Sequence, residues 1–451
     1  DLLFLTPYKQ TAWGESVIES ILYILWDLSF KVGYSVRTVE DCLRLAKNDI
    51  TIRTSLIEKR YLYGEKVLEE ELTARLWTEL FRRSGSEFIE AKLIEREQRH
   101  RRHGGSRYMV EPNIKEGKGG LRDLQTLYWI LKYLYNASHP EDFVANGVFN
   151  HEEFKVFEKA ERFLWSIRCN LHLSAKRAGE QLHFNTQVEL AAKLGYTDKK
   201  GMRAVEVFMQ DYFRQAKNVG DLTRILLAAL EATHVKPRPT VSSTIKSALQ
   251  FSFGGYERLV PEGFVIKLGR LDVLNSSSFI KSPLNLINLF HISSKLQTLV
   301  HPNALRLVAN NLTLINKSFK TSAEANKIFI ELLINHKNPE KVLRSMNEVG
   351  FLGKFIPEFG RIVALMQFNM YHTFTVDEHT IQCIKNLSEI ENGKLSEELP
   401  IASKILKGNI NRKVLYLALL FHDIGKGFPE DHSEKGAKIV NKIIDRFGLN
   451  P

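Results

Sequence analysis

The most restrictive feature of this chain is a long succession of helically periodic segments in its middle. Between residues 120 and 235, apolar side chains recur every three or four positions, and almost nothing alternates as a strand would. Such periodicity is typical of amphipathic helices that bury one face. The segments that carry it are LQTLYWILKYLYN, FKVFEKAERFLWSIRCNLHLSA and AVEVFMQDYFRQAKNVGDLTRILLAALEA. The chain is therefore predicted to be mainly α.

The beginning of the chain follows a different pattern. Two β-prone stretches, DLLFL and KVGYSVRTV, flank a stretch with helical periodicity, GESVIESILYILWDLSF. VEDCLRLAKN then predicts a helix, and ITIRTSLIEKRYLYG a second β-prone stretch that merges into a helix. A small β segment is also expected much later, in GFVIKLGRLDVL. The predicted fold class is thus mainly α with an α/β start.

Length and charge limit the possible organisation. A chain of 451 residues usually forms roughly two to four domains. HVKPRPTVSST, at 234–244, is the best candidate for a linker because it combines two prolines with a polar cluster. The formal net charge of +11 favours acidic partners such as nucleotides, nucleic acid or an acidic protein surface.

The three cysteines and the apolar runs indicate the compartment. Cys42, Cys169 and Cys383 are far apart in the sequence and form neither a CxxC metal site nor a plausible disulfide framework. No apolar run approaches the length of a membrane span, and the start of the chain does not resemble a signal peptide. We therefore expect a cytoplasmic location and no membrane partner.

The stretch FHDIGKGFPEDHSEKGA, at 421–437, contains the clearest candidate for a metal site. His422 and Asp423 follow the apolar run VLYLALLF, so they are expected at the end of a buried helix. An imidazole and a carboxylate together suit a divalent cation that also holds water and phosphate oxygens. A further ligand is expected from upstream, where His379 lies at a predicted helix start. The alternative is a helix whose solvated end happens to be polar.

Two neighbouring residues extend this candidate site. Lys426 could neutralise charge on a scissile phosphate, or extend to solvent at a helix end. His432 is a further candidate, and Asp431 is expected to cap the helix that follows it. The order of an upstream histidine, an apolar helix and then HDIGK resembles the HD superfamily of metal-dependent phosphohydrolases.

The stretch EPNIKEGKGGLRDLQTLYWI, at 111–130, is the other concentration of candidate residues. Lys115, Gly119, Gly120 and Arg122 precede or open an amphipathic helix, where backbone N–H groups could approach a triphosphate. The alternative is a flexible loop with a glycine-rich helix start. No GxxxxGK[ST] is present, so this is not a P-loop.

Several segments together resemble one family, the bifunctional uridylyltransferase/uridylyl-removing enzymes that act on the bacterial PII nitrogen-signalling protein. The resemblance extends over essentially all 451 residues. The segments that carry it are KVGYSVRTVEDCL, SLIEKRYLYG, EPNIKEGKGGLRDLQTL, YHTFTVDEHTI and FHDIGKG with DHSEKGA. The family implies a partial polymerase-β-like nucleotidyltransferase domain (1–110), a helical domain that completes it (111–235), a helical connector (236–360) and the first part of an all-α HD domain (361–451).

For the first half, the resemblance implies transfer of UMP from UTP to a tyrosine of PII, with Mg²⁺ or Mn²⁺ as cofactor. Asp1 matches the second carboxylate of a metal-binding Asp-x-Asp, and it heads a predicted strand, where such enzymes place metal-binding acids. Glu58 is the expected third carboxylate, chosen over Asp49. The residues expected to bind the nucleotide are Arg37, Asn113, Lys115, Gly119, Gly120, Arg122 and Asp123.

For the second half, the resemblance implies hydrolysis of the UMP–tyrosine phosphodiester. His379, His422 and Asp423 match metal ligands, with Lys426 and His432 as catalytic residues. The family continues into two regulatory ACT domains that sense glutamine. We therefore expect this chain to be the catalytic middle of a longer enzyme, truncated at both ends, with glutamine acting through domains outside it.

Two other functions remain open. A nucleotidyltransferase–HD enzyme acting on RNA ends would suit the positive charge and the basic run REQRHRRHGGSRY, at 96–108, although such a run is usually a solvated helix face. We therefore do not expect nucleic acid as the partner. The second alternative is an inactive helical scaffold that binds PII without chemistry.

Overall fold

The computed structural model describes two compact units. One comprises residues 1–99 and 125–154, the other 100–124 and 155–451, so the division falls inside three helices. The linker predicted at 234–244 lies outside the described residues except for His234. The described ranges are 1–104, 106–137, 139–175, 178–199, 201–234, 257–260, 263–267, 269–335, 338–367, 374–408 and 410–449.

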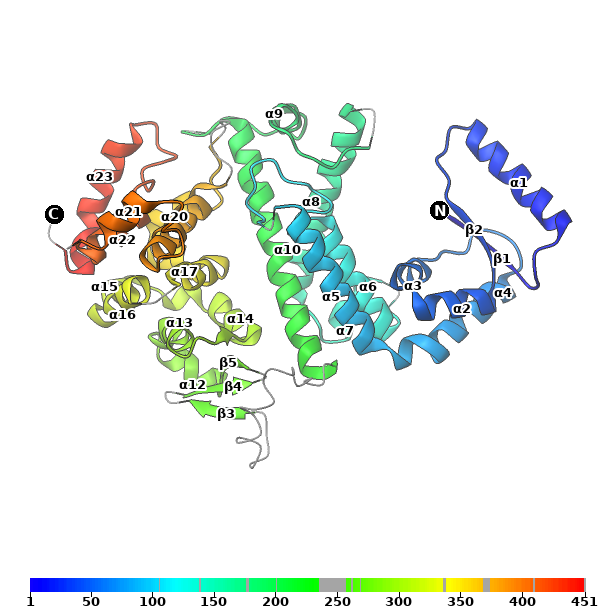
Figure 1. Ribbon diagram of the computed structural model, residues 1–451, viewed down its shortest axis with the longest axis horizontal. Helices are drawn as coiled ribbons and strands as arrows, with labels where there is room; N and C mark the ends of the chain where they lie inside the picture. The colour runs from blue at the N-terminus through cyan, green and yellow to red at the C-terminus, as the bar shows by residue number, and fades with distance from the viewer. Residues whose placement is uncertain are drawn as a thin grey trace. The chain divides into compact units, whose positions relative to one another are not determined.

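The first unit begins with the predicted α/β arrangement. Strands β1 (Leu2–Thr6) and β2 (Tyr34–Thr38) pair in parallel, connected through helix α1 (Ala12–Asp27) (Figure 1). Helix α2 (Val39–Asn48) starts directly after β2 because Thr38 and Asp41 form a reciprocal capping box, with Asp41 N donating to Thr38 Oγ1 at 3.1 Å. The predicted strands and both helices are confirmed.

The prediction of β structure in ITIRTSLIEKRYLYG was wrong. Residues Ile50–Ile57 form helix α3 instead. The Asp49 carboxylate caps this helix by accepting hydrogen bonds from Thr51 N at 2.7 Å and Ile52 N at 3.2 Å. The isoleucines and threonines favour strands only weakly, and this capping and the contact with α2 outweigh that preference.

The rest of the first unit is helical and contains a small core. Helices α2 and α4 and the turn after α4 bury apolar side chains that include Cys42, Leu43 and Leu72. On α5 and α6, the Phe88 and Tyr133 rings stack with centroids 4.0 Å apart. These elements are α4 (Lys66–Arg75), a π-helical turn (Leu76–Leu80), a 3-10 turn (Phe81–Arg83), α5 (Gly85–Arg102), α6 (Leu121–Tyr135) and α7 (Asp142–Ala145).

The second unit starts with long helices and a small sheet. Helices α8 (His151–Ala175) and α10 (Ala204–His234) correspond to two of the periodic segments of the sequence, and α9 (Phe184–Lys193) lies between them in the chain. The sheet has the order β3-β4-β5-β6, with β5 and β6 parallel and the other neighbours antiparallel. Its strands are β3 (Glu257–Val260), β4 (Phe264–Lys267), β5 (Arg270–Val273) and β6 (Leu299–Val300). The β segment expected in GFVIKLGRLDVL is thus present.

Short helices make up the remainder of the described chain, and the prediction of a mainly α fold with an α/β start is confirmed. No helix in the described ranges is long and apolar enough to cross a membrane. The helices are α12 (Ser276–Lys281), α13 (Asn285–Lys295), α14 (Pro302–Asn310), α15 (Lys317–Thr321), α16 (Ala323–Ile334), α17 (Pro339–Glu348), α18 (Phe351–Phe355), α19 (Pro357–Ile362), α20 (Val376–Glu391), α21 (Pro400–Leu406), α22 (Arg412–Phe421) and α23 (His432–Ile443), with 3-10 turns at Leu312–Leu314 and Ile444–Phe447.

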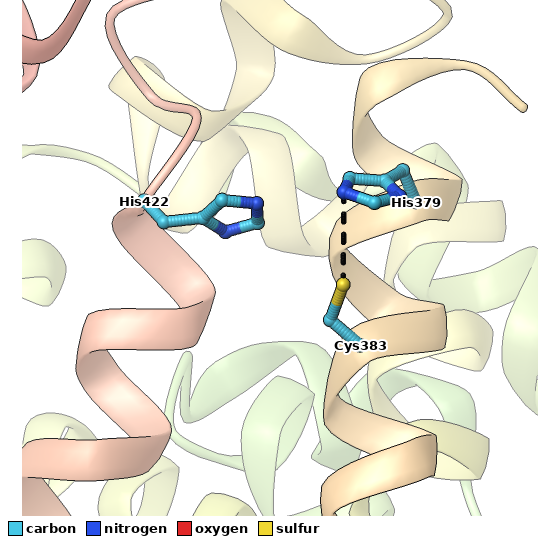
Figure 2. A group of neighbouring side chains, drawn as sticks. All are labelled: His379, Cys383 and His422. Carbon is cyan, nitrogen blue, oxygen red and sulfur yellow. Dashed lines mark hydrogen bonds between the residues drawn. The ribbon is translucent and has the colours of Figure 1, made fainter. Parts of the chain in front are cut away.

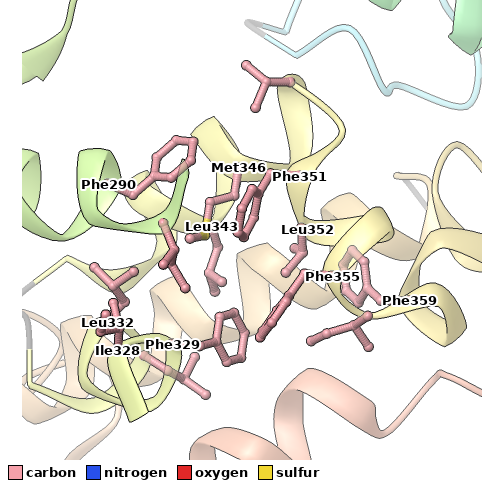
Figure 3. Close-up of a cluster of buried hydrophobic side chains, with 14 of the residues drawn as sticks. Phe290, Ile328, Phe329, Leu332, Leu343, Met346, Phe351, Leu352, Phe355 and Phe359 are labelled. Atoms are coloured by element: carbon pink, nitrogen blue, oxygen red, sulfur yellow. The ribbon is translucent and has the colours of Figure 1, made fainter. Parts of the chain in front are cut away.

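An aromatic core joins these short helices. Phe351 and Phe355 stack with ring centroids 5.7 Å apart, within a cluster of buried side chains from α13, α16, α17 and α18 (Figure 3). Phe447 continues the cluster, 5.8 Å from Phe329 on one side and 5.8 Å from Phe421 on the other. Since Phe421 is the last residue of α22, the core fixes the position where that helix ends.

Candidate metal centre

Two segments that are far apart in the sequence meet between helices α20 and α22, and together they contribute three candidate metal ligands. His379 lies in the first turn of α20, and His422 and Asp423 follow directly after α22. The two imidazole rings point toward each other with centroids 5.5 Å apart (Figure 2). Asp423 Oδ2 lies 3.3 Å from His422 Nε2 and 4.0 Å from His379 Nε2. The structure therefore brings together the three residues of the C-terminal segment that the sequence predicted as metal ligands.

Tertiary hydrogen bonds fix the start of α20. The Asp377 carboxylate is fully buried and accepts hydrogen bonds from Asn347 Nδ2 at 2.7 Å and Ala364 N at 3.1 Å. The neighbouring carboxylate of Glu378 accepts one from Arg344 Nη2 at 2.7 Å. Because these two acids are the second and third residues of the helix, they hold the histidine that follows them in a defined position.

The His422 side chain is oriented by the backbone of its own helix. Its Nδ1 donates to the carbonyl oxygen of Leu419 at 2.7 Å, so its Nε2 faces Asp423. The carboxylate of Asp423 raises the pKa of His422. Burial opposes ionisation of Asp423, but His422 and Lys426 together hold the pKa of this carboxyl below its ordinary value. The site is thus arranged around a negative charge.

This arrangement fits a divalent cation. With Nδ1 committed as a donor, a neutral His422 presents the lone pair of Nε2 toward Asp423 Oδ2, and two acceptors at 3.3 Å need a proton or a cation between them. Asp423 Oδ2 is buried and makes no hydrogen bond of good geometry within the described part of the chain. Imidazole nitrogens and a carboxylate oxygen are a donor set that first-row divalent metals accept. His379, His422 and Asp423 could therefore hold such an ion.

A cysteine that was not expected here lies in the same place. Cys383 is one helical turn after His379 on α20, and its Sγ is 3.6 Å from His379 Nε2 (Figure 2). Donor atoms of His379, Cys383 and His422 all lie within 4.8 Å of one another. From the sequence, Cys383 was expected only to be far from the other two cysteines. Its spacing of four residues from His379 is the feature that predicts a shared helix face.

Lys426 and His432 lie on either side of the turn after α22. Lys426 is buried, with Nζ 2.8 Å from Asp423 Oδ2, so its observed partner is the candidate ligand. His432 is exposed as the first residue of α23, which Asp431 caps as expected by accepting from Ser433 N at 2.9 Å. The roles predicted for Lys426 and His432 toward a phosphate stay predictions.

The predicted transferase carboxylates lie in the first unit. The Asp1 side chain lies against Gly33, where an added Cβ would come within 2.5 Å of Asp1 Oδ1, so a larger residue there would displace the Asp1 side chain. Arg37 is on β2, paired with Leu5 of β1. Glu58, at the end of α3, forms an ion pair of 3.4 Å with Lys132. Asp1 and Glu58 thus have different neighbours, and their predicted shared metal stays a prediction.

The glycine-rich stretch forms a tightly packed turn before α6. Gly119 has φ +84° and lies against the carbonyl of Ala216 on α10, where no Cβ would fit. The fully buried Asp123 carboxylate accepts from Gly119 N at 2.9 Å and lies 2.9 Å from His100 Nε2. Gly120 packs in the same way against backbone carbonyls of the turn. These residues build the turn, and their predicted nucleotide contacts stay predictions.

Three polar residues of this stretch also have local partners. Asn113 Oδ1 accepts from Lys115 N at 3.1 Å and Glu116 N at 2.7 Å, an Asx-type turn. The Glu116 carboxylate pairs with Lys115 Nζ at 3.7 Å and with Arg122 Nη2 at 3.3 Å. Lys115 and Arg122 are partly exposed, so they remain accessible to a ligand.

A polar cavity of about 230 Å³ opens beside this turn. Its one acidic lining residue, Glu111, is engaged by Phe184 N at 2.9 Å. Positive side chains therefore dominate the cavity. Arg102, His103 and Arg107 come from the basic run at 96–108, which is usually a solvated helix face, whereas Lys118 belongs to the glycine-rich stretch. The cationic and histidine lining residues are Arg102, His103, Arg107 and Lys118.

Comparisons with known proteins cover most of the described chain. Residues 87–227 match the model of the GlnD PII-uridylyltransferase family. Residues 264–355 match the third domain of uridylyltransferase GlnD, and residues 376–449 match the HD domain. The helices α20 and α22 that carry His379 and His422 thus belong to the segment that matches the HD domain.

Curated relatives match over the full length of the chain. It is 56% identical over 449 residues to a bifunctional uridylyltransferase/uridylyl-removing enzyme of Cereibacter sphaeroides, covering 100% of this chain and 47% of that protein. A protein of the same description from Ruegeria pomeroyi is 55% identical over 450 residues, 100% of this chain and 48% of the relative. The resemblance predicted from the sequence is confirmed. The chain spans about half the length of the curated relatives it matches.

Proposed function

We infer that this chain belongs to the family of bifunctional uridylyltransferase/uridylyl-removing enzymes, and we propose that its HD segment removes UMP from a uridylylated tyrosine of PII by hydrolysis. The single observation that carries this proposal is the convergence of His379, His422 and Asp423 from two helices. The matches to the HD domain and to the curated enzymes support it.

Three of the chain's own residues would prepare this site. His379 and His422 present ring nitrogens, and Asp423 presents a carboxylate oxygen, on the walls of one site. The Leu419 carbonyl fixes which nitrogen of His422 is available. A divalent cation bound there, Mn²⁺ or Mg²⁺, supplies a Lewis acid and an activated water for attack on phosphorus.

The remaining residues would handle the charges of the substrate. Lys426 forms a 2.8 Å ion pair with the Asp423 carboxylate, and we propose that its ammonium also neutralises charge on the scissile phosphate. His432, exposed at the start of α23, is proposed to contact the substrate near the leaving tyrosine. Both roles rest on their proximity to Asp423 in the sequence and on the family resemblance.

The test is UMP release from uridylylated PII by this chain in the presence of Mn²⁺. Wild type is expected to release UMP, and His422→Ala to release none above background, with less bound metal. His139→Ala is the matched control, because His139 is exposed and lies in the other unit. If His422→Ala leaves both UMP release and metal content unchanged, the assignment fails.

For the other activity, we propose that the N-terminal part contributes to transfer of UMP from UTP to PII. Asp1 and Glu58 are the proposed metal-binding carboxylates, and Arg37, proposed to bind the nucleotide, lies in the same unit. Asn113 lines the positive cavity next to the 111–123 turn, and this cavity supports a phosphate-bearing ligand there. We propose that Lys115, Gly119, Gly120, Arg122 and Asp123 also contribute to the nucleotide site. Binding of UTP to the chain, weakened by Lys115→Ala and unaffected by Lys404→Ala, would test this part.

PII, UTP and a cytoplasmic location complete the proposal. PII is the protein named in the family model that matches residues 87–227. We place the response to glutamine outside these 451 residues, in the length of the relatives that this chain does not span. If the chain binds tRNA tightly in a salt-sensitive manner and does not bind PII, the alternative of an enzyme acting on RNA ends is favoured instead.

A further inference from the structure

Cys383 lies in the candidate metal centre, although it was not among the residues that the sequence predicted as metal ligands. It lies on α20 one turn beyond His379, with Sγ 3.6 Å from His379 Nε2. The two histidines and this thiol come from two helices and have donor atoms within 4.8 Å of one another. Figure 2 shows the sulfur on the same side of α20 as the His379 ring.

The environment of the thiol differs from that of an exposed cysteine. Its neighbours on α20, Ile381 and Ile384, are fully buried, and Cys383 itself is half-buried. An ordinary cysteine thiol is mostly protonated at neutral pH, and only its thiolate form is a strong metal ligand. A neutral thiol beside an imidazole becomes a strong donor only when a metal ion displaces its proton.

The carboxylate of the site is held differently. Asp423 Oδ2 lies 2.8 Å from the ammonium of Lys426, within the same turn. Next to the two histidines, the Asp423 oxygen is therefore already paired with the charge of a lysine. The Cys383 sulfur instead has His379 as its hydrogen-bond partner. The Cys383 thiol is thus a second group, besides the Asp423 carboxylate, that can bind a metal ion together with the two histidines.

We propose that Cys383 binds metal as a thiolate together with His379 and His422, giving a nitrogen–sulfur donor set that selects Zn²⁺ or Co²⁺ over Mg²⁺. On binding, the S–H bond breaks, a sulfur–metal bond forms and one proton passes to solvent, with no change of oxidation state. Thiolate and imidazole favour such borderline ions, whereas Mg²⁺ prefers oxygen ligands. The inference rests on the proposed function, since it uses the same two histidines.

Cobalt provides a direct test that does not depend on activity. Titration of the metal-free chain with Co²⁺ is expected to give ligand-field bands and a sulfur-to-cobalt charge-transfer band in the near ultraviolet. Cys383→Ser should lose the charge-transfer band and bind Zn²⁺ roughly 10- to 100-fold more weakly, a loss typical of a disturbed metal shell. Cys169→Ser is the matched control, because Cys169 is exposed on α8, and it should keep both properties.

Proton release gives a second readout. Below the pKa of the thiol, wild type should release one proton more than Cys383→Ser for each Zn²⁺ bound. Cys383→Ala, which fills less of the site and adds no new oxygen ligand, should behave like Cys383→Ser. Circular dichroism would verify that each variant keeps its helices.

The outcomes separate this inference from the function it rests on. If the charge-transfer band and Zn²⁺ affinity of Cys383→Ser equal those of wild type, Cys383 is not a ligand, while the histidine site stands. If His422→Ala binds Co²⁺ as wild type does, the metal centre itself is wrong, and the proposed hydrolase function falls with it. Loss of the band in Cys383→Ser but retention in Cys169→Ser supports the inference.

Discussion

The N-terminal α/β region and the helices α20 to α23 both carry carboxylates proposed to bind metal, but they are built differently. In the first region, α1 exposes Trp13, 78% accessible, and Ile24, 61% accessible, and Asp1 rests against a glycine at the head of a two-stranded sheet. In the second, Phe421 and Ile424 are buried on both sides of the His422–Asp423 pair. The candidate ligands of the second region are therefore held in defined positions by buried neighbours, whereas Asp1 lies at the edge of a small sheet.

Replacement of the candidate ligand should produce the largest difference between the two regions. We expect Asp423→Ala, in a protein of the relatives' full length, to reduce UMP removal by at least about 100-fold, since several kcal/mol of charge stabilisation is lost with the cation. Transfer of UMP to PII should be unchanged, because its proposed carboxylates lie in the other unit. Both activities are measured by release and incorporation of labelled UMP.

Loss of both activities in a folded Asp423→Ala protein would contradict the separation of the two sites. His139→Ala serves as the control for general damage.

Core packing should show the next largest difference. Phe355 is fully buried in the aromatic cluster, so Phe355→Ala is expected to lower the free energy of unfolding by about 3–5 kcal/mol. Trp13→Ala removes an aromatic side chain that is 78% exposed. It should change the free energy of unfolding by less than about 0.5 kcal/mol. Urea denaturation followed by circular dichroism measures both, and an equal cost for the two would remove the proposed contrast in packing.

Two ion pairs connect Glu348 on α17 with the 100–124 segment and with α10. They predict that the stability of the protein depends on pH. Glu348 lies 3.6 Å from the buried Arg107 and 3.1 Å from Arg224. Burial opposes its ionisation, but these two guanidinium groups lower the pKa of Glu348 below its ordinary value. Its stabilisation is therefore present above the ordinary carboxyl pKa and is lost as the pH falls through the lowered value.

Glu348→Gln should therefore cost about 3 kcal/mol at pH 7, since it leaves Arg107 charged and buried without its anion. Below about pH 4, near the ordinary carboxyl pKa, the difference from wild type should shrink as wild type loses its own stabilisation. Thermal unfolding between pH 3 and pH 7 would measure this, with Glu398→Gln on the exposed surface as the control. A difference that does not vary with pH would show that the ion pair contributes little.

The smallest expected effect concerns the small apolar core of the N-terminal region. Cys42 is fully buried on α2, and burial raises the pKa of its thiol to about 11. The stability that the neutral thiol contributes is fully present below the ordinary pKa of a thiol. It is lost as the pH rises from there to the raised pKa of Cys42. At pH 8, iodoacetamide should modify the exposed Cys169 quickly and Cys42 only after unfolding, as mass spectrometry of the peptides would show. Rapid modification of Cys42 would mean that this small core is open.

Local patterns explain most of what the sequence predicted correctly. The run VLYLALLF places His422 and Asp423 at a helix end because one face of α22 is apolar and buried. Asp431 caps the helix that follows it, as predicted from its residue type. The prediction failed at Ile50–Ile57, where β-branched residues became a helix, because a cap and packing outweighed their weak preference.

Contacts between distant segments explain what the sequence did not predict. The structural role of Gly119 depends on the approach of Ala216, almost a hundred positions later along the chain, which no local pattern reveals. The basic cavity arises because Arg102 and Arg107 meet the turn that carries Lys118. A run of positive residues alone is equally compatible with a solvated helix face.

By itself, the sequence determined which residue types could do chemistry here and on which helices they lie, because helical periodicity and capping act over a few neighbouring residues. Only the tertiary structure decided that the imidazoles of His379 and His422 face each other and that the thiol of Cys383 joins them. The physical reason is that a helix sets the spacing of side chains along its own axis, whereas the distance between two helices is set by the core packed between and around them.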